Sequence, residues 1–185
     1  MKNQLDVVTL GEAMMMFVAT QTGKLHEVEN FVRRAAGAEL NVAVGLSRLG
    51  LKTGWISRLG NDSFGRFIQA TLDNEYIDTQ CVTVDSRYPT GFQLKSKAEN
   101  GTDPIVEYFR QGSAASHLDL TDFNEDYFLS ARHLHLSGVA AALSPTSYQL
   151  SLHAAKWMRN AGKTLSFDPN LRPSLWKSET AMVEQ

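Results

Sequence analysis

Apolar runs and apolar residues at helical spacing alternate along most of this chain. An apolar run at residues 7–10, which ends at Gly11, is typical of a buried strand. Residues 38–49 place apolar side chains on one side of a helix, and Gly50 follows as a stop signal. The same reasoning predicts strands at 53–59, 133–136 and 164–167, and helices at about 63–74, 123–130 and 144–160. This alternation predicts a parallel α/β sheet with helices on both faces.

Two segments break the alternation, because they contain extended runs with no helix between them. The first covers runs at 14–18 and 26–32, and the second covers runs at 92–97 and 105–109, joined by the turn-rich residues 99–103. We expect these segments, within about 14–34 and 91–110, to form a small antiparallel β lid. In open α/β sheets, ligands bind at the carboxyl ends of the parallel strands, so the candidate chemistry is sought there.

Composition indicates an ordinary globular protein with one domain over residues 1–185, since 43% of the residues are hydrophobic and 21% are charged. The formal net charge of −2 gives no electrostatic case for binding nucleic acid or an anionic membrane. No apolar run approaches the roughly 20 residues of a membrane span, and no long apolar region follows Lys2 as in a secretory signal. Cys81 is the only cysteine, which fits a reducing cytoplasm.

The start of the helix at 38–49 is the first candidate binding site. Gly37 lets a ligand approach the backbone, and the free N–H groups of a helix start favour oxygen-rich ligands. Asn41 offers both a donor and an acceptor, which suits recognition of hydroxyl groups. The alternative to a binding site is a tight strand–helix connection in which the Asn41 side chain makes its hydrogen bonds within the core.

Two arginines form the second candidate site. Tyr108 and Arg110 share one face of a predicted strand, because side chains alternate along a strand with period two. Arg172 follows the end of another strand. A guanidinium group can hold a carboxylate or a phosphate at two points, so two arginines at one site would indicate an anionic substrate. For either arginine alone, a solvated surface position is the alternative.

Other motifs point to no further chemistry. His133 and His135 share a strand face, but no third metal ligand is evident, so we expect ordinary packing or hydrogen bonding and no metal site. The chain has no Walker A loop, no G-x-G-x-x-G, no G-x-S-x-G and no zinc-ligand spacing. The triplet at 11–13 is too short for a dinucleotide fingerprint, which makes a Rossmann dehydrogenase a poor alternative.

Several motifs together resemble a known family. Residues 37–43, Gly50, residues 60–62 and Gly65 resemble the N-terminal signature of the ribokinase-like (PfkB) carbohydrate kinases. Residues 108–116, 133–145 and 168–173, with Leu175 and Trp176, are similar to the 2-keto-3-deoxygluconate kinases within that family. The resemblance spans essentially the whole chain. It implies a ribokinase-like, Rossmann-like fold whose lid covers the substrate and often serves as a dimer interface, so a homo-oligomer is expected.

The resemblance also implies a reaction and its site. The full-length enzyme would use ATP and Mg²⁺ to phosphorylate 2-keto-3-deoxygluconate, a sugar acid, to the 6-phosphate. Gly37 and Asn41 would meet the sugar acid, Tyr108 would contact its hydroxyl or keto groups, and Val139 would line the pocket. Arg110 and Arg172 would hold the carboxylate, and Gln93 stands where such kinases can carry an aromatic contact. Two further residues are expected near the transferred phosphate, Asp168 and Asn170.

The family's catalytic base and anion hole lie in a late Gly-Ala-Gly-Asp motif, and a middle Asn-x-x-Glu segment organises Mg²⁺ and phosphate. The sequence up to Gln185 contains neither. We therefore expect residues 1–185 to be the N-terminal, mainly sugar-binding part of the fold, without the catalytic residue. On their own, these residues are expected to be inactive and poorly soluble. The alternatives are a fructokinase or ribokinase relative, or a noncatalytic sugar-acid-binding fragment.

Overall fold

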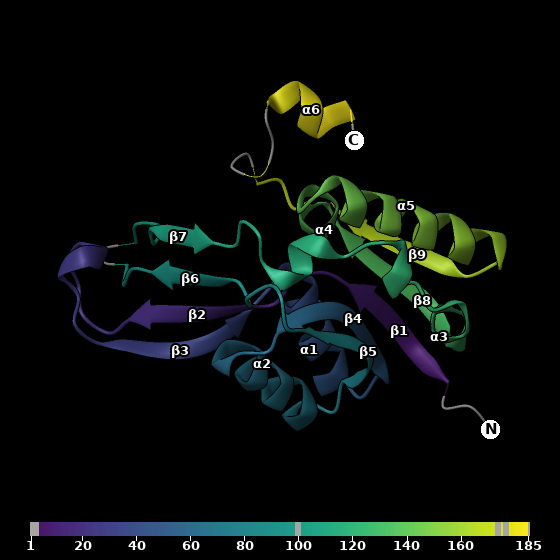
Figure 1. The fold of residues 1–185 in the computed structure, drawn as a ribbon, viewed down its shortest axis with the longest axis horizontal. Helices are drawn as coiled ribbons and strands as arrows, with labels where there is room; N and C mark the ends of the chain where they lie inside the picture. The colour runs from purple at the N-terminus through teal and green to yellow at the C-terminus, as the bar shows by residue number, and fades with distance from the viewer. Residues whose placement is uncertain (1–3, 99–100, 173–174, 176–177, 185) are drawn as a thin grey trace.

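A computed structural model describes residues 4–98, 101–172, 175 and 178–184. Its main sheet has the strand order β5-β4-β1-β8-β9, and every neighbouring pair is parallel (Figure 1). The predicted parallel sheet is thus confirmed. Its strands are β1 (Leu5–Leu10), β4 (Thr53–Gly60), β5 (Asp78–Asp85), β8 (Ala131–Ser137) and β9 (Thr164–Asp168).

Helices cover both faces of the main sheet, as expected. The helices α1 (Ala38–Arg48) and α2 (Ser63–Asn74) pack on one face, and α3 (Glu125–Ser130), α4 (Gly138–Ala142) and α5 (Pro145–Asn160) lie on the other (Figure 1). Single 3₁₀ turns form η1 (Leu25–Glu27), η2 (Ala114–His117) and η3 (Leu120–Asp122), and α6 (Glu179–Glu184) comes last. The sequence analysis did not predict α4 or strand β5.

Strand β4 divides the hydrophobic core in two, because successive side chains of a strand point to opposite faces. Trp55 packs with Leu40 of α1 and with Ile68 and Leu72 of α2. Its neighbour Ile56 belongs to the other cluster, with residues of β8, α3 and α5. All eight residues of β4 are buried, whereas all five of β9, at the edge of the sheet, are exposed.

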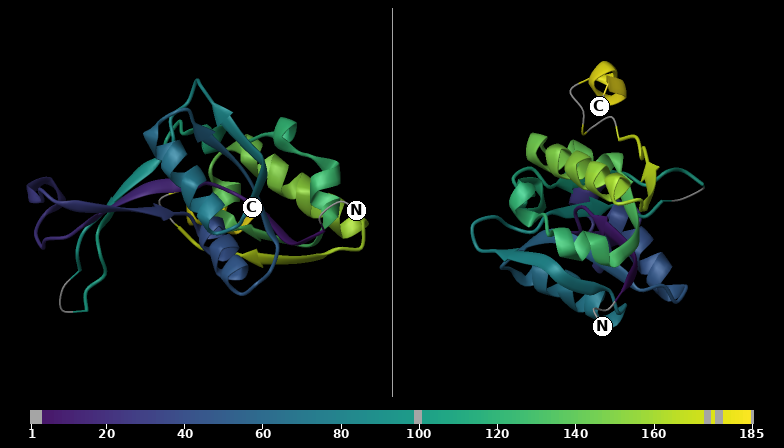
Figure 2. Two further views of the ribbon diagram at one scale, coloured as in Figure 1. Left: turned by 90° about the horizontal axis from the view of Figure 1, so that it is seen from below. Right: turned by 90° about the vertical axis from the view of Figure 1, so that its right-hand side faces the viewer.

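The second sheet is the lid, which we define as β2 (Met14–Ala19), β3 (Phe31–Ala36), β6 (Phe92–Lys95) and β7 (Val106–Phe109). Figure 2 shows it extending from the body of the molecule as an arm. The order is β3-β2-β6-β7, and the outer pairs are antiparallel, as expected. The central pair β2–β6 is parallel, so the sheet is mixed rather than purely antiparallel. The reason is that β2 and β6 open two separate hairpins that leave the body in the same direction.

Two details of the lid differ from the sequence expectation. Residues 26–32 do not form one strand, because residues 25–27 make the turn η1 and β3 begins only at Phe31. Strand β3 continues to Ala36, beyond the expected limit of 34. The expected turn at 99–103 includes residues 99 and 100, which lie outside the described residues. None of the helices formed by the described residues is long and apolar enough to cross a membrane.

Candidate functional site

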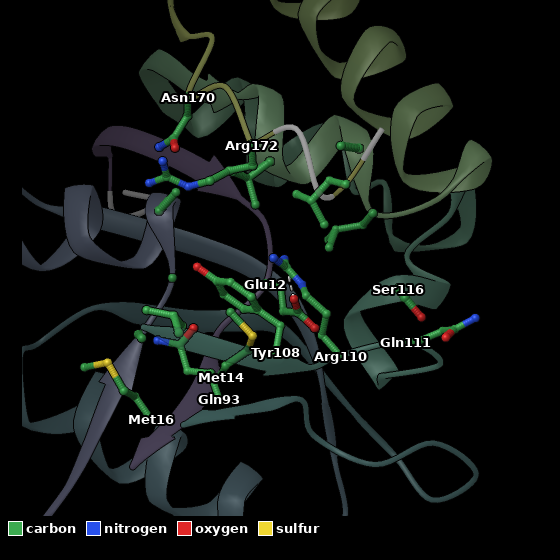
Figure 3. A pocket seen from close by; sticks show the side chains of 18 of the residues that line it. Glu12, Met14, Met16, Gln93, Tyr108, Arg110, Gln111, Ser116, Asn170 and Arg172 are labelled. Carbon is green, nitrogen blue, oxygen red and sulfur yellow. Dashed lines mark ion pairs between the residues drawn. The ribbon is translucent and has the colours of Figure 1, made fainter. Parts of the chain in front are cut away.

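A cavity of about 1420 Å³ lies between the lid and the body of the molecule. Strands β2, β3, β6 and β7 contribute one wall, and the start of α1, the region from α4 to α5 and the segment after β9 contribute the others (Figure 3). All seven residues that the sequence analysis assigned to substrate binding line this cavity: Gly37, Asn41, Gln93, Tyr108, Arg110, Val139 and Arg172. Their roles toward a ligand stay predictions.

The start of α1 forms a close backbone approach. Gly37 precedes the helix and has extended backbone, so left-handed strain does not explain the glycine. A Cβ atom at this position would instead collide with the carbonyl oxygen of Glu12. Asn41 is exposed and lines the cavity, so it does not occupy the core as the structural alternative required. The helix start can therefore present backbone and amide groups to a ligand.

The side chain of Arg110 is mostly buried and not solvated, which contradicts the surface alternative for this residue. Its side chain is 12% exposed, and its Nη2 lies 2.5 Å from Oε2 of Glu12, whose side chain is 0% exposed (Figure 3). Arg110 directly follows β7 and does not belong to the strand as expected, and its Cζ atom lies 5.9 Å from the ring centroid of Tyr108 on β7. Burial raises the pKa of Glu12, and the charge of Arg110 opposes that rise. The pair places a guanidinium group beside the cavity with its position fixed by a buried carboxylate.

Arg172 approaches the cavity from the segment after β9. Figure 3 shows Asn170 and Arg172 on the opposite side of the cavity from Gln93 and Met16. Arg172 is exposed, in contrast to Arg110. Among the described residues that line the cavity, the cationic side chains are Lys95, Arg110 and Arg172, and the carboxylate is Glu12. Cationic groups therefore outnumber carboxylates on this wall. This charge distribution favours an anionic ligand.

The two expected phosphate-proximal residues differ in position. Asn170 lines the cavity, but Asp168 is not among the lining residues. The carboxylate of Asp168 instead accepts hydrogen bonds from the backbone N (2.9 Å) and side-chain Nδ2 (3.1 Å) of Asn170. Asn170 has a positive φ of 39°, which asparagine tolerates better than most residues. Asp168 thus shapes the turn that presents Asn170, and Pro173 and Trp176 of the same motif lie outside the described residues.

A second buried carboxylate lies behind the cavity, at Glu39 in the first turn of α1. Its Oε1 accepts hydrogen bonds from Ser137 Oγ and from the backbone N of Ala140 (3.0 Å). Its Oε2 lies against Gly11 and has no hydrogen-bond partner among the described residues. Burial raises the pKa of this carboxyl group. Glu39 therefore ties the start of α1 to the start of α4, where Val139 lines the cavity.

The two histidines of β8 make hydrogen bonds to the neighbouring strand. His133 Nδ1 lies 2.7 Å from Thr164 Oγ1, and His135 Nδ1 lies 2.9 Å from Ser166 Oγ. Partial burial lowers the pKa of both imidazoles. No group of three or more His, Cys, Asp or Glu that could hold a metal ion occurs within the described ranges.

A sequence profile of the pfkB family carbohydrate kinases matches residues 4–185. The chain belongs to this family. This PfkB chain is 49% identical over 181 residues to the 2-dehydro-3-deoxygluconokinase of Bacillus subtilis (strain 168), covering 97% of this chain and 56% of that protein. The chain thus spans little more than half the length of that relative.

Solved structures agree with this assignment. The PfkB protein from Polaromonas sp. JS666 superimposes with a TM-score of 0.95 and 52% identity, covering 97% of this chain and 60% of that one. A sugar kinase from Pyrococcus horikoshii in complex with ATP matches with a TM-score of 0.88 and 30% identity, covering 96% of this chain and 58% of that one. The PfkB chain is thus a carbohydrate kinase by family, with a ribokinase-like fold.

Sequence reasoning missed the buried polar groups that support the cavity. Glu12 lies at the carboxyl end of the first predicted strand, where chemistry was expected, but no role was assigned to it, and Glu39 was noted only as part of the family signature. A carboxylate next to a glycine at the end of an apolar strand was the available signal for Glu12. No comparable signal marked its hydrogen-bond partner Ser113, which lies 101 residues away in the sequence.

Proposed function

We propose that the complete protein catalyses ATP-dependent phosphorylation of 2-keto-3-deoxygluconate to its 6-phosphate, and that residues 1–185 carry mainly the sugar-acid site. The observation that carries this proposal is the presence of Arg110 and Arg172 on the cavity that also contains Gly37 and Asn41. Two guanidinium groups suit a carboxylate, and the helix start suits hydroxyl groups. The similarity to a 2-dehydro-3-deoxygluconokinase supports the same substrate class.

A fructokinase or ribokinase activity is the second candidate within the enzyme class. Neutral sugars have no carboxylate for Arg110 and Arg172, so the cationic wall favours the sugar acid over a neutral substrate. A noncatalytic sugar-acid-binding role is the candidate outside the enzyme class. Saturable binding of the sugar acid with no ATP consumption by the complete protein would favour that role.

ATP is the phosphoryl donor that a carbohydrate kinase family implies, and we propose Mg²⁺ as its companion. The described residues do not build a magnesium site, since Asp168 is engaged by Asn170 and no acidic cluster accompanies it. We therefore assign no ligand of the ion to this part of the chain. The part we assign to these residues is the binding and orientation of the sugar acid.

We also propose that the protein forms a homo-oligomer through the lid and works in a reducing compartment such as the cytoplasm. The lid extends from the body (Figure 2), and Val32, Tyr108 and Phe109 on its strands are exposed. Sedimentation velocity should give the mass of a dimer or a larger assembly. The variant Val32→Glu should shift the distribution toward monomer, and an unchanged distribution would exclude the start of β3 from the interface.

The substrate proposal is tested with Arg172→Met. Arg172 is exposed, so its removal should leave the melting temperature unchanged. Loss of charge-assisted hydrogen bonds worth about 1.5–3 kcal/mol should raise the KM for the sugar acid roughly 10- to 100-fold. Steady-state kinetics of the protein expressed from its complete reading frame measure this, with Arg159→Met on α5 as the matched control. An unchanged KM for the acid would exclude a carboxylate-binding role.

A further inference from the structure

The lid is joined to the body by four chain crossings. Residues 11–13 connect β1 to β2, and Gly37 connects β3 to α1. Residues 86–91 lead from β5 to β6, and residues 110–113 lead from β7 to η2. Any change in the position of the lid relative to the body must therefore pass through these four short segments.

Glu12 lies in the first crossing and touches the other three. Its carbonyl oxygen occupies the space that a Cβ atom at Gly37 would need. Its Oε1 is 2.9 Å from the position of a Cβ atom at Gly91, and it accepts a hydrogen bond of 2.5 Å from Ser113 Oγ. Its Oε2 faces Arg110 Nη2 at 2.5 Å. The Glu12 carboxylate thus bonds the first crossing to the fourth, through Ser113 and Arg110, and lies close to Gly91 of the third, while the backbone carbonyl of Glu12 packs against Gly37 of the second.

The same carboxylate sets the orientation of Arg110. A guanidinium group carries five N–H donors in a rigid fork, so fixing one side of the fork fixes where the rest points. Glu12 Oε2 forms an ion pair with Nη2, while neither Nη2 nor Nε of Arg110 has a hydrogen-bond partner of good geometry among the described residues. Glu12 borders the cavity, but its side chain has no exposed surface, so it offers no accessible oxygen to a ligand there. Its effect on a ligand must act through Arg110.

We propose that Glu12 is the positioning residue of the sugar-acid site, because it bonds the first lid crossing to the fourth, packs against the other two and orients Arg110 toward the substrate carboxylate. The second part rests on the proposed function, while the anchoring of the lid does not. A substrate carboxylate would then share Arg110 with Glu12, and binding would tighten the junction between lid and body. Gly91 and Ser113 belong to the same arrangement, because Gly91 leaves room for the Glu12 carboxylate and Ser113 donates a hydrogen bond to it.

The test compares Glu12→Gln and Glu12→Asp with Glu107→Gln, an exposed control on β7, in the protein expressed from its complete reading frame. Glutamine keeps an acceptor for Ser113 but removes the charge, and aspartate keeps the charge but shortens the reach. We expect both Glu12 variants to raise the KM for 2-keto-3-deoxygluconate roughly tenfold or more, with the KM for ATP unchanged. General damage to the fold would shift both constants.

A second readout needs no substrate. Hydrogen exchange of the backbone amides in residues 14–19 and 92–95 should become about tenfold faster in both variants, because loss of the anchor lowers the local opening free energy. Unchanged exchange together with an unchanged KM would overturn the role of Glu12. If the unmodified protein does not phosphorylate the sugar acid, the proposed function fails, and the exchange data alone then decide whether Glu12 anchors the lid.

Discussion

Replacing Arg110 by methionine should lower the free energy of unfolding by about 3–5 kcal/mol, because it leaves the buried Glu12 carboxylate without a counter-ion. Methionine retains much of the apolar volume, so the loss of charge is the main change. The Glu12 side chain has no solvent contact to compensate for the lost partner. Urea denaturation at neutral pH, followed by circular dichroism, measures the change.

The double variant Glu12→Gln, Arg110→Met separates this charge effect from packing. It should recover a substantial part of the lost stability, since the side chain at position 12 then carries no charge that needs a partner. Arg172→Met serves as the control, because Arg172 is exposed and should change stability by less than about 0.5 kcal/mol. Equal destabilisation of the single and double variants would show that the Arg110 side chain acts through packing and not through its charge.

Local signals in the sequence were sufficient for most elements of the main sheet. Helix α5 was predicted from Ser144 and Pro145 to residue 160, and the structure shows Ser144 capping that helix in a reciprocal capping box with Ser147. The sequence allowed either Asp62 or Ser63 to cap helix α2, and the structure shows Asp62 as the cap, through the backbone N of Gly65 (2.7 Å). Capping and periodicity are encoded within a few residues, so one sequence is enough to find them.

Elements without such local signals were missed or misplaced. Strand β5 mixes buried and exposed residues without clean alternation, and α4 has only five residues. The parallel pairing of β2 with β6 joins two hairpins far apart in the chain, so no local pattern specifies it. Residue chemistry and placement at strand ends and helix starts were enough to find Gly37, Asn41 and the two arginines, and the family resemblance added Gln93 and Val139. Glu12 and Glu39 become notable only when tertiary structure buries them.

Replacing Glu39 by glutamine should change the pH dependence of stability. An ordinary glutamate has a pKa near 4.5, and burial raises the pKa of Glu39 in the folded protein. Between these two pKa values the folded state binds a proton that the unfolded state has released, so the unmodified protein loses stability as the pH rises. The slope from this one group is at most about 1.4 kcal/mol per pH unit.

Glutamine removes this dependence, because it carries no titrating proton, and its Oε1 can still accept from Ser137 and from the backbone N of Ala140. The difference in unfolding free energy, Glu39→Gln minus the unmodified protein, should therefore be flat below pH 4.5 and increase above it. The increase should stop once the pH exceeds the raised pKa of Glu39. Urea denaturation from pH 4 to pH 8 measures the difference, with the exposed Glu107→Gln as control. A difference that stays constant over this range would show that Glu39 is ionised in the folded protein at the ordinary pKa, with its charge balanced by Ser137 and the start of α4.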